Sequence, residues 1–178
     1  LKFSETLSRD YFVNAHWALY CENYLEGFHI PFVHQSLNAV VDFDSYQTET
    51  FRFASLQTGF AKSGENAFAF NDKIAALYFF VFPNLMLNFY PWGLSVNVVK
   101  PLQKDLTKVS YLTFVGDESK LGRGAGGDLG RVEFEDQAVV ESVQKGINSR
   151  FYERGRYSPE REQGTHHFHQ LIAEFMNG

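Results

Sequence analysis

Residues 14–35 read NAHWALYCENYLEGFHIPFVHQ, and the interpretation of the whole chain starts from this segment. Its aromatic and apolar side chains recur at steps of three and four residues, which predicts an amphipathic helix with one buried face. These residues are Trp17, Tyr20, Cys21, Tyr24 and Phe28. A proline disfavours helical geometry at the residue before it, so we expect Pro31 to end or kink the helix near Ile30.

The same segment contains candidate metal ligands in the order Glu26-x-x-His29-x-x-x-x-His34. On a helix Glu26 and His29 are neighbours, whereas the step from His29 to His34 turns through about 500° and separates the rings. A break at Pro31 lets His34 turn back towards His29. Two imidazoles with carboxylates one turn earlier suit a divalent transition metal. Spacing alone leaves a second interpretation open, in which both histidines are ordinary core or surface residues.

Residues 22–34, ENYLEGFHIPFVH, resemble the iron-binding segment of Rieske non-haem iron oxygenase α subunits. This family includes aromatic-ring-hydroxylating dioxygenases and the choline and carnitine monooxygenases. The resemblance implies that His29 and His34 bind a mononuclear Fe(II). It also implies that Glu26 passes electrons to this iron from a Rieske [2Fe–2S] cluster on a neighbouring subunit, and that Asn23 lies near the iron.

Composition limits the classes of protein to which the chain can belong. Its 178 residues suit one domain, and the formal charge of −5 without a basic patch makes nucleic acid an unsuitable partner. No apolar run is long enough to cross a membrane and no secretory leader is visible, so we expect a cytoplasmic protein. Cys21 is the one cysteine, whereas a Rieske cluster needs two cysteines and two histidines. We therefore expect the Rieske cluster on a separate domain or chain.

The middle of the chain has the alternation of β-strands. Strands are predicted over residues 45–53, 76–82, 85–90, 94–100 and 107–115, and short polar turns between them imply antiparallel pairing. We expect turns at Gly59 and over 62–66, a loop over 36–44, and no regular element in the polar residues 1–10. Residues 82–102, FPNLMLNFYPWGLSVNVVKPL, are also similar to central strands of the oxygenase family.

Residues 122–127, GRGAGG, satisfy the G-x-G-x-x-G pattern of dinucleotide-binding loops. That motif must follow a strand tightly and open a helix within a βαβ unit. Here six residues separate it from the strand that ends near Val115, and no parallel strand follows. We interpret the segment as a flexible connector rather than a nucleotide-binding loop.

Helical spacing returns over residues 132–152, and two interpretations of its acidic residues are open. The helix has apolar residues on one side, namely Phe134, Ala138, Val139, Val143 and Ile147. Its acids suit a solvated face, but one carboxylate could also complete a two-histidine metal site. Residues 135–150, EDQAVVESVQKGINSR, resemble the family segment with the third iron ligand, which maps to Asp136, with Glu135 as the alternative.

A last helix is predicted over residues 158–176, with Ser158 as N-cap and Pro159 at the first helical position. It contains His166, His167 and His169, which do not share a helical face. We interpret them as packing or interface residues rather than a second metal site. Residues 155–170 are similar to the closing helix of the oxygenase family.

These elements predict an α+β protein with an antiparallel sheet, and the resemblance implies a helix-grip fold in which the sheet wraps around a long helix. It also implies a homotrimeric oxygenase that uses O₂ and electrons from a Rieske or reductase partner. The substrate would be an aromatic ring or a quaternary-ammonium or N-methyl compound, since an aromatic pocket suits either. The rival hypotheses are a helix-grip carrier of a hydrophobic small molecule without iron, and a catalytic fragment that binds iron but is inactive alone.

Overall fold

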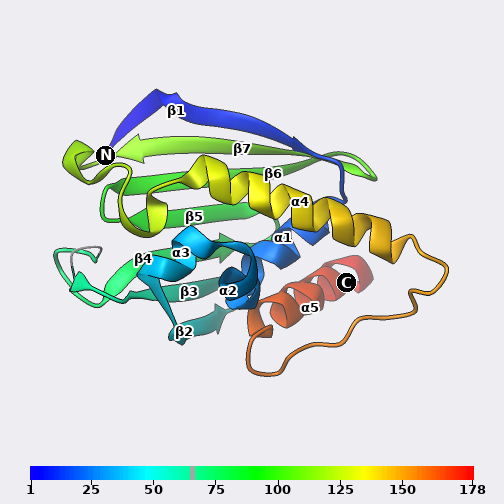
Figure 1. Cartoon of the computed structure of the whole chain (residues 1–178). Helices are drawn as coiled ribbons and strands as arrows, with labels where there is room; N and C mark the ends of the chain where they lie inside the picture. Colours follow the sequence, from blue (N-terminus) through cyan, green and yellow to red (C-terminus); the bar gives the residue numbers. More distant parts are fainter. Residues whose placement is uncertain (65–66) are drawn as a thin grey trace.

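The computed structural model describes residues 1–64 and 67–178, and its framework is one antiparallel sheet (Figure 1). The seven strands lie in the order β1-β7-β6-β5-β4-β3-β2. Their bounds are β1 (Lys2–Val13), β2 (Val41–Phe51), β3 (Ala54–Ala61), β4 (Ile74–Val81), β5 (Leu85–Tyr90), β6 (Gly93–Gln103) and β7 (Leu106–Val115). Strands β2 to β7 follow one another as a meander, and β1 pairs with β7 at the far edge.

The helices lie on one face of this sheet (Figure 1). They are α1 (Trp17–Leu25), η1 (Gly27–His29), α2 (Ile30–Val33), α3 (Gln35–Val40), η3 (Glu118–Lys120), η4 (Gly124–Gly126), α4 (Leu129–Ile147) and α5 (Gln163–Asn177). Because β1 and β2 are opposite edges of the sheet, the chain between them has to cross its face. That crossing carries α1, α2 and α3 over the central strands. The predicted α+β helix-grip architecture is confirmed.

The main core lies between the central strands and the helices α1 and α5. Alternate residues of the strands point towards the helices, as the period of two requires, and Phe80, Met86 and Val99 are buried there. Phe168 of α5 packs edge-on against Phe80 and Trp17. The aromatic weight of the sequence therefore fills the space between sheet and helices.

Three predictions for the strands and loops were wrong. Residues 1–10 belong to β1, an edge strand whose side chains are mostly exposed on both faces, so its sequence lacks an apolar alternation. The loop predicted over 36–44 contains most of α3 and the start of β2. Gly59 lies inside β3 rather than in a turn, packed near Tyr78 and Val41. Of the turn predicted over 62–66, residues 65 and 66 lie outside the described part of the chain.

The apolar residues of α4 predicted which face of this helix would be buried, but the structure buries the opposite face. Phe134 is 65% exposed and Val143 43% exposed, whereas Glu133 and Gln144 are buried with Val140. The cause is the polar surface that α4 covers, because that surface presents tyrosine hydroxyls and imidazoles rather than aliphatic groups. No helix in the described ranges is long and apolar enough to cross a membrane.

The start of the last helix also differs from its prediction. α5 begins at Gln163 with Glu162 at the N-cap position, and residues 158–162 form a separate turn. The backbone N–H of Ser158 donates to the Glu162 carboxylate (2.6 Å), so Ser158 is bound by the turn instead of capping the helix.

The glycine-rich segment packs against the fold instead of forming a loose connector. Ala125 and Gly126 are buried, and the Trp92 indole N–H donates to the Gly126 carbonyl oxygen (3.1 Å). A Cβ atom at Gly126 would come within 2.4 Å of Trp92 Nε1, so this position requires glycine. Gly126 therefore allows the backbone of this segment to approach the Trp92 ring closely.

Candidate metal centre

The turn that follows α1 is organised by Glu26. Its backbone is extended (φ −119°, ψ 114°), and its Oε2 accepts hydrogen bonds from the N–H groups of Phe28 (3.0 Å) and His29 (3.2 Å). These bonds satisfy N–H groups that the first turn of a helix leaves free. Helix α1 therefore ends at Leu25, earlier than the predicted break near Ile30.

Gly27 and Pro31 determine the path from this break to His34. Gly27 lies against Tyr46, where a Cβ atom would come within 2.7 Å of the ring. Pro31 does not end a helix but begins the short α2, at a position where its missing N–H has no cost. His34 follows α2 with a non-helical backbone (φ −104°, ψ 77°), which turns the chain back over the site.

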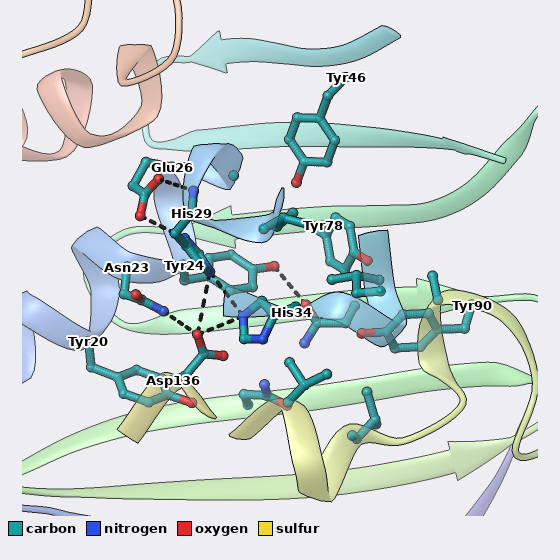
Figure 2. Close-up of a pocket in the computed structure, with 18 of the residues that line it drawn as sticks. Tyr20, Asn23, Tyr24, Glu26, His29, His34, Tyr46, Tyr78, Tyr90 and Asp136 are labelled. Carbon is teal, nitrogen blue, oxygen red and sulfur yellow. Dashed lines mark hydrogen bonds and ion pairs between the residues drawn. The ribbon is translucent and has the colours of Figure 1, made fainter. Parts of the chain in front are cut away.

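His29 and His34 meet as the sequence predicted. Their Nε2 atoms are 3.1 Å apart, and the ring planes cross at 76°. His34 is 1% exposed. The turn between the two residues, rather than a continuous helix, brings the rings together (Figure 2).

Asp136 reaches the two imidazoles from α4, which packs beside α1. Its Oδ1 lies 3.0 Å from His34 Nε2 and 3.4 Å from His29 Nε2. Asn23 donates from Nδ2 to the same oxygen (2.7 Å), although the two residues are 113 positions apart in sequence. Figure 2 shows these side chains converging on one point.

Two further carboxylates contact the Nδ1 atoms of the histidine rings, on the side away from the metal position. Glu26 Oε1 lies 2.7 Å from His29 Nδ1, and Glu135 Oε2 lies 2.8 Å from His34 Nδ1. Glu135 also accepts from Arg131 Nε (3.0 Å) through its other oxygen. A carboxylate on Nδ1 fixes the ring and leaves Nε2 free to bind. Glu135, the alternative third ligand, is therefore engaged on the far side of His34.

The donor set fits one face of an octahedral metal site. Ligand atoms about 2.1 Å from a metal and at right angles to one another lie about 3.0 Å apart. The three candidate atoms, Nε2 of His29, Nε2 of His34 and Oδ1 of Asp136, are separated by 3.0–3.4 Å. Two histidines and one carboxylate are also the set that non-haem Fe(II) oxygenases use. In the described part of the chain, this is the group of His, Asp, Glu or Cys residues placed to hold a metal ion.

The charges around His29, His34 and Asp136 favour a bound cation in place of the histidine protons. Burial alone would lower the pKa of His29, but hydrogen bonds with Asp136 and Glu26 outweigh it and raise the pKa to about 9. Burial acts on His34 in the same direction, and its contacts with Asp136 raise its pKa overall. Burial would raise the pKa of Asp136, yet the two histidines lower it. A divalent cation can take the place of the histidine protons between these carboxylates.

The three donor atoms border a cavity between the helices and the sheet. Its wall includes aromatic hydroxyl side chains from α1, β2, β4, β5 and β7, and two asparagines from the central strands. The tyrosines are Tyr20, Tyr24, Tyr46, Tyr78, Tyr90 and Tyr111, and the asparagines are Asn88 and Asn97. Figure 2 labels Tyr20, Tyr24, Tyr46, Tyr78 and Tyr90 around the metal ligands.

Sequence reasoning missed the asparagines and most of these tyrosines as site residues. A signal for two of them was present, because Asn88 and Asn97 stand at inward-facing positions of β5 and β6 and each lies between two apolar residues in sequence. A polar residue in that register is either bonded within the core or faces a ligand. The tyrosines gave no such signal, because tyrosine also packs in ordinary cores.

Glu133 is a second carboxylate of α4 that points inward, one turn before Asp136. It is 0% exposed and accepts hydrogen bonds from the hydroxyls of Tyr20 and Tyr111 and from Gln137 Nε2 (3.1 Å). Burial raises its pKa to about 7, and the three hydrogen bonds only partly oppose that effect. A solvated face, one of the two interpretations of the acids on this helix, therefore does not hold for Glu133.

The histidines of α5 lie away from the metal ligands. His169 Nε2 contacts Glu22 Oε1 (2.8 Å), and its Nδ1 bonds the Tyr157 hydroxyl. His166 packs edge-on against the same tyrosine ring. This arrangement agrees with the interpretation of these histidines as packing residues.

Comparison with known proteins gives a family match over almost the whole chain. Residues 2–178 match the family described as ring hydroxylating alpha subunit, catalytic domain. The chain is 38% identical over 175 residues to the chloroplastic choline monooxygenase of Arabidopsis thaliana. It is 32% identical over 174 residues to the carnitine monooxygenase oxygenase subunit of Escherichia coli K12.

A solved structure of similar fold is that of a quaternary ammonium Rieske monooxygenase, described in connection with carnitine oxidation by gut microbiota and inter-subunit electron transfer. It superposes with a TM-score of 0.77 at 25% identity and covers 98% of this chain and 50% of that one. The alignments with the Arabidopsis and E. coli proteins cover 92% and 90% of this chain, but only 40% and 46% of those proteins. The chain thus spans less than half the length of these relatives.

Proposed function

The chain belongs to the family of ring-hydroxylating α subunits, as their catalytic domain, and we propose that it hydroxylates a quaternary ammonium compound at a mononuclear iron. The observation that supports this most is the convergence of His29, His34 and Asp136 with donor atoms 3.0–3.4 Å apart. Relatives named as choline and carnitine monooxygenases support the substrate class over an aromatic ring.

In this proposal His29, His34 and Asp136 hold the iron, and neighbouring residues hold these ligands in place. Glu26 keeps the proton of His29 on Nδ1, and Glu135 does the same for His34, so that both Nε2 atoms offer a lone pair. Asn23 donates to Asp136 Oδ1 and restricts its rotation. When bound, iron supplies the activation of O₂ with electrons from a Rieske cluster.

The tyrosine walls bind the substrate and exclude bulk water from the reacting groups. A quaternary ammonium group has no hydrogen to donate, so it binds best against the faces of aromatic rings. Tyr78 packs edge-on against both Tyr24 and Tyr90 beside the metal ligands, which presents ring surfaces to the cavity. The same burial keeps their hydroxyls protonated, since it raises the pKa of all three.

We further propose that Glu26 connects His29 to an electron donor on a neighbouring subunit of a homotrimer. Its side chain is 14% exposed while it bonds His29 directly, so it reaches from the ligand to the protein surface. Residues 1–178 act as one catalytic domain, and the Rieske cluster and its reductase belong to another domain or chain. The single cysteine, Cys21, is buried and free, which supports the proposed cytoplasmic location.

The experiment that tests this proposal is iron stoichiometry after anaerobic loading with Fe(II). We expect about one iron per chain. The variant His34→Ala should lose it, whereas His166→Ala, which removes an exposed histidine of α5, should keep it. Absence of iron from both the unmodified chain and His166→Ala would instead favour the ligand carrier. Iron without turnover, restored by an added Rieske donor, would identify a catalytic fragment.

A further inference from the structure

We propose that the catalytic cavity selects a quaternary ammonium substrate whose second polar group is an uncharged oxygen, and that Asn97 donates a hydrogen bond to that oxygen. Among the substrates named for the relatives, this favours a compound of the choline type over one of the carnitine type. The inference rests on the proposed function and specifies the substrate of the same site.

The charged groups around the cavity leave no partner for a substrate carboxylate. Of the described residues that line it, Glu26 and Asp136 are acidic, His29 and His34 face the metal position, and none is lysine or arginine. The nearby Arg131 is bound to Glu135. A carboxylate that enters this cavity would lose its water beside two other carboxylates and without a lysine or arginine to pair with it, which is unfavourable.

The side-chain amide of Asn97 has a donor without an acceptor in the described part of the chain. It lies on β6, is 4% exposed, and lines the cavity. Its Oδ1 accepts a hydrogen bond from Ser95 Oγ (2.8 Å), and Ser95 is fully buried. This bond orients the amide so that Nδ2 is left without a hydrogen-bond partner in the described chain, at the cavity surface.

Asn88 provides the contrast on the neighbouring strand. It lines the same cavity, yet both ends of its amide are used within the protein. Its Oδ1 accepts from the Tyr24 hydroxyl (2.9 Å), and its Nδ2 donates to the Ser95 carbonyl oxygen (3.2 Å). Asn88 therefore maintains the cavity wall, whereas Asn97 has a donor left for the substrate.

One amide N–H matches an uncharged oxygen better than a carboxylate. A hydroxyl or carbonyl oxygen that accepts a single hydrogen bond is satisfied, whereas a buried carboxylate needs several donors or a cation. The cavity thus offers tyrosine faces to a cation and one amide donor to a neutral oxygen. This combination fits a small quaternary amino-alcohol or its oxidised carbonyl form.

The test compares three ligands by calorimetry on the Fe(II)-loaded protein under anaerobic conditions. Choline and ethyltrimethylammonium differ by one hydroxyl group, and carnitine adds a carboxylate. We expect choline to bind about 5-fold more tightly than ethyltrimethylammonium, the usual effect of one hydrogen bond. Carnitine should bind more weakly than choline by a factor on the order of 100, because its carboxylate is unpaired.

The variant Asn97→Leu separates the role of the amide from that of the cavity. It should remove the preference for choline over ethyltrimethylammonium and leave ethyltrimethylammonium affinity unchanged within about twofold. Retained binding of ethyltrimethylammonium also shows that the variant is folded.

The possible failures are distinguishable. Tight binding of carnitine, or equal binding of choline and ethyltrimethylammonium by the unmodified protein, overturns this inference and leaves the proposed oxygenase function standing. Failure of all three ligands to bind to an iron-loaded protein overturns the proposed substrate class as well.

Discussion

Replacement of Glu133 by glutamine should stabilise the fold at alkaline pH. Glu133 is completely buried beneath α4, and no cation pairs with it in the described chain. Its hydrogen-bond partners are the hydroxyls of Tyr20 and Tyr111 and the Gln137 amide. A glutamine oxygen accepts from both tyrosines without carrying charge, and Gln137 can rotate its amide to offer an acceptor.

The magnitude follows from the pKa of this carboxyl group. Burial raises the pKa of Glu133 from 4.5 to about 7. Below pH 4.5 the folded and unfolded chains both hold the proton, so ionisation has no effect on stability. Between pH 4.5 and 7 only the unfolded chain loses it, so the free energy of unfolding falls as pH rises. Above pH 7 the full penalty applies, and the pKa difference corresponds to about 3 kcal/mol.

The assay is urea unfolding of metal-free Glu133→Gln and unmodified protein at pH 5, 6, 7 and 8. The gain in unfolding free energy for the variant should grow over this range and level off near about 3 kcal/mol above pH 7. Glu153→Gln, in an exposed loop, controls for the removal of one negative charge. A gain that is the same at pH 5 and pH 8, or a loss of stability at pH 8, would refute the reasoning.

Three further predictions concern the metal site and its support. Glu26→Gln should retain iron but block electron-coupled turnover in the complete oxygenase, because the neutral amide bonds His29 without a carboxylate; unchanged turnover would remove Glu26 from the electron path. Gly27→Ala should lower the unfolding free energy by about 1–3 kcal/mol, since its Cβ would overlap the Tyr46 ring. Gly146→Ala, in α4, has open space around its Cβ and serves as the control without a clash, which should leave stability unchanged or raise it, so an equal loss in the two substitutions would contradict the packing argument. Removal of Fe(II) by a chelator should lower the Tm by several degrees, since a metal at about 100 times its Kd adds roughly 2.7 kcal/mol; the same loss in His34→Ala would show that the site is not responsible.

Much of the candidate site was predictable because its chemistry is local in sequence. Glu26, His29 and His34 lie within nine residues, and their spacing around Pro31 indicated a broken helix with converging rings. The family resemblance on these residues is confirmed by the match over residues 2–178. The roles of the individual residues stay predictions until metal content is measured.

The third carboxylate was predictable only as a choice between neighbours. Asp136 and Glu135 are adjacent on α4, and a shift of one position turns a side chain by about 100° around the helix axis. The packing of α4 against α1 directs Asp136 to the two Nε2 atoms and Glu135 to the back of His34. Glu133 and Asn97 were not identified as buried functional candidates, because their burial depends on elements distant in sequence.

The sequence by itself determined the elements and the reactive segment, since periodicity, proline and the acid–histidine spacing are properties of short stretches of chain. It therefore predicted the antiparallel strands, the two histidines and a helix broken between Glu26 and His34, although it placed the break near Ile30 rather than after Leu25. Only the tertiary structure decided which face of α4 is buried, which carboxylate meets the histidines, and which amide of the sheet keeps a free donor. Those outcomes depend on contacts between residues more than one hundred positions apart, such as Asn23 with Asp136. Such contacts follow from how α4 packs across the sheet, and no local pattern in the chain encodes that geometry.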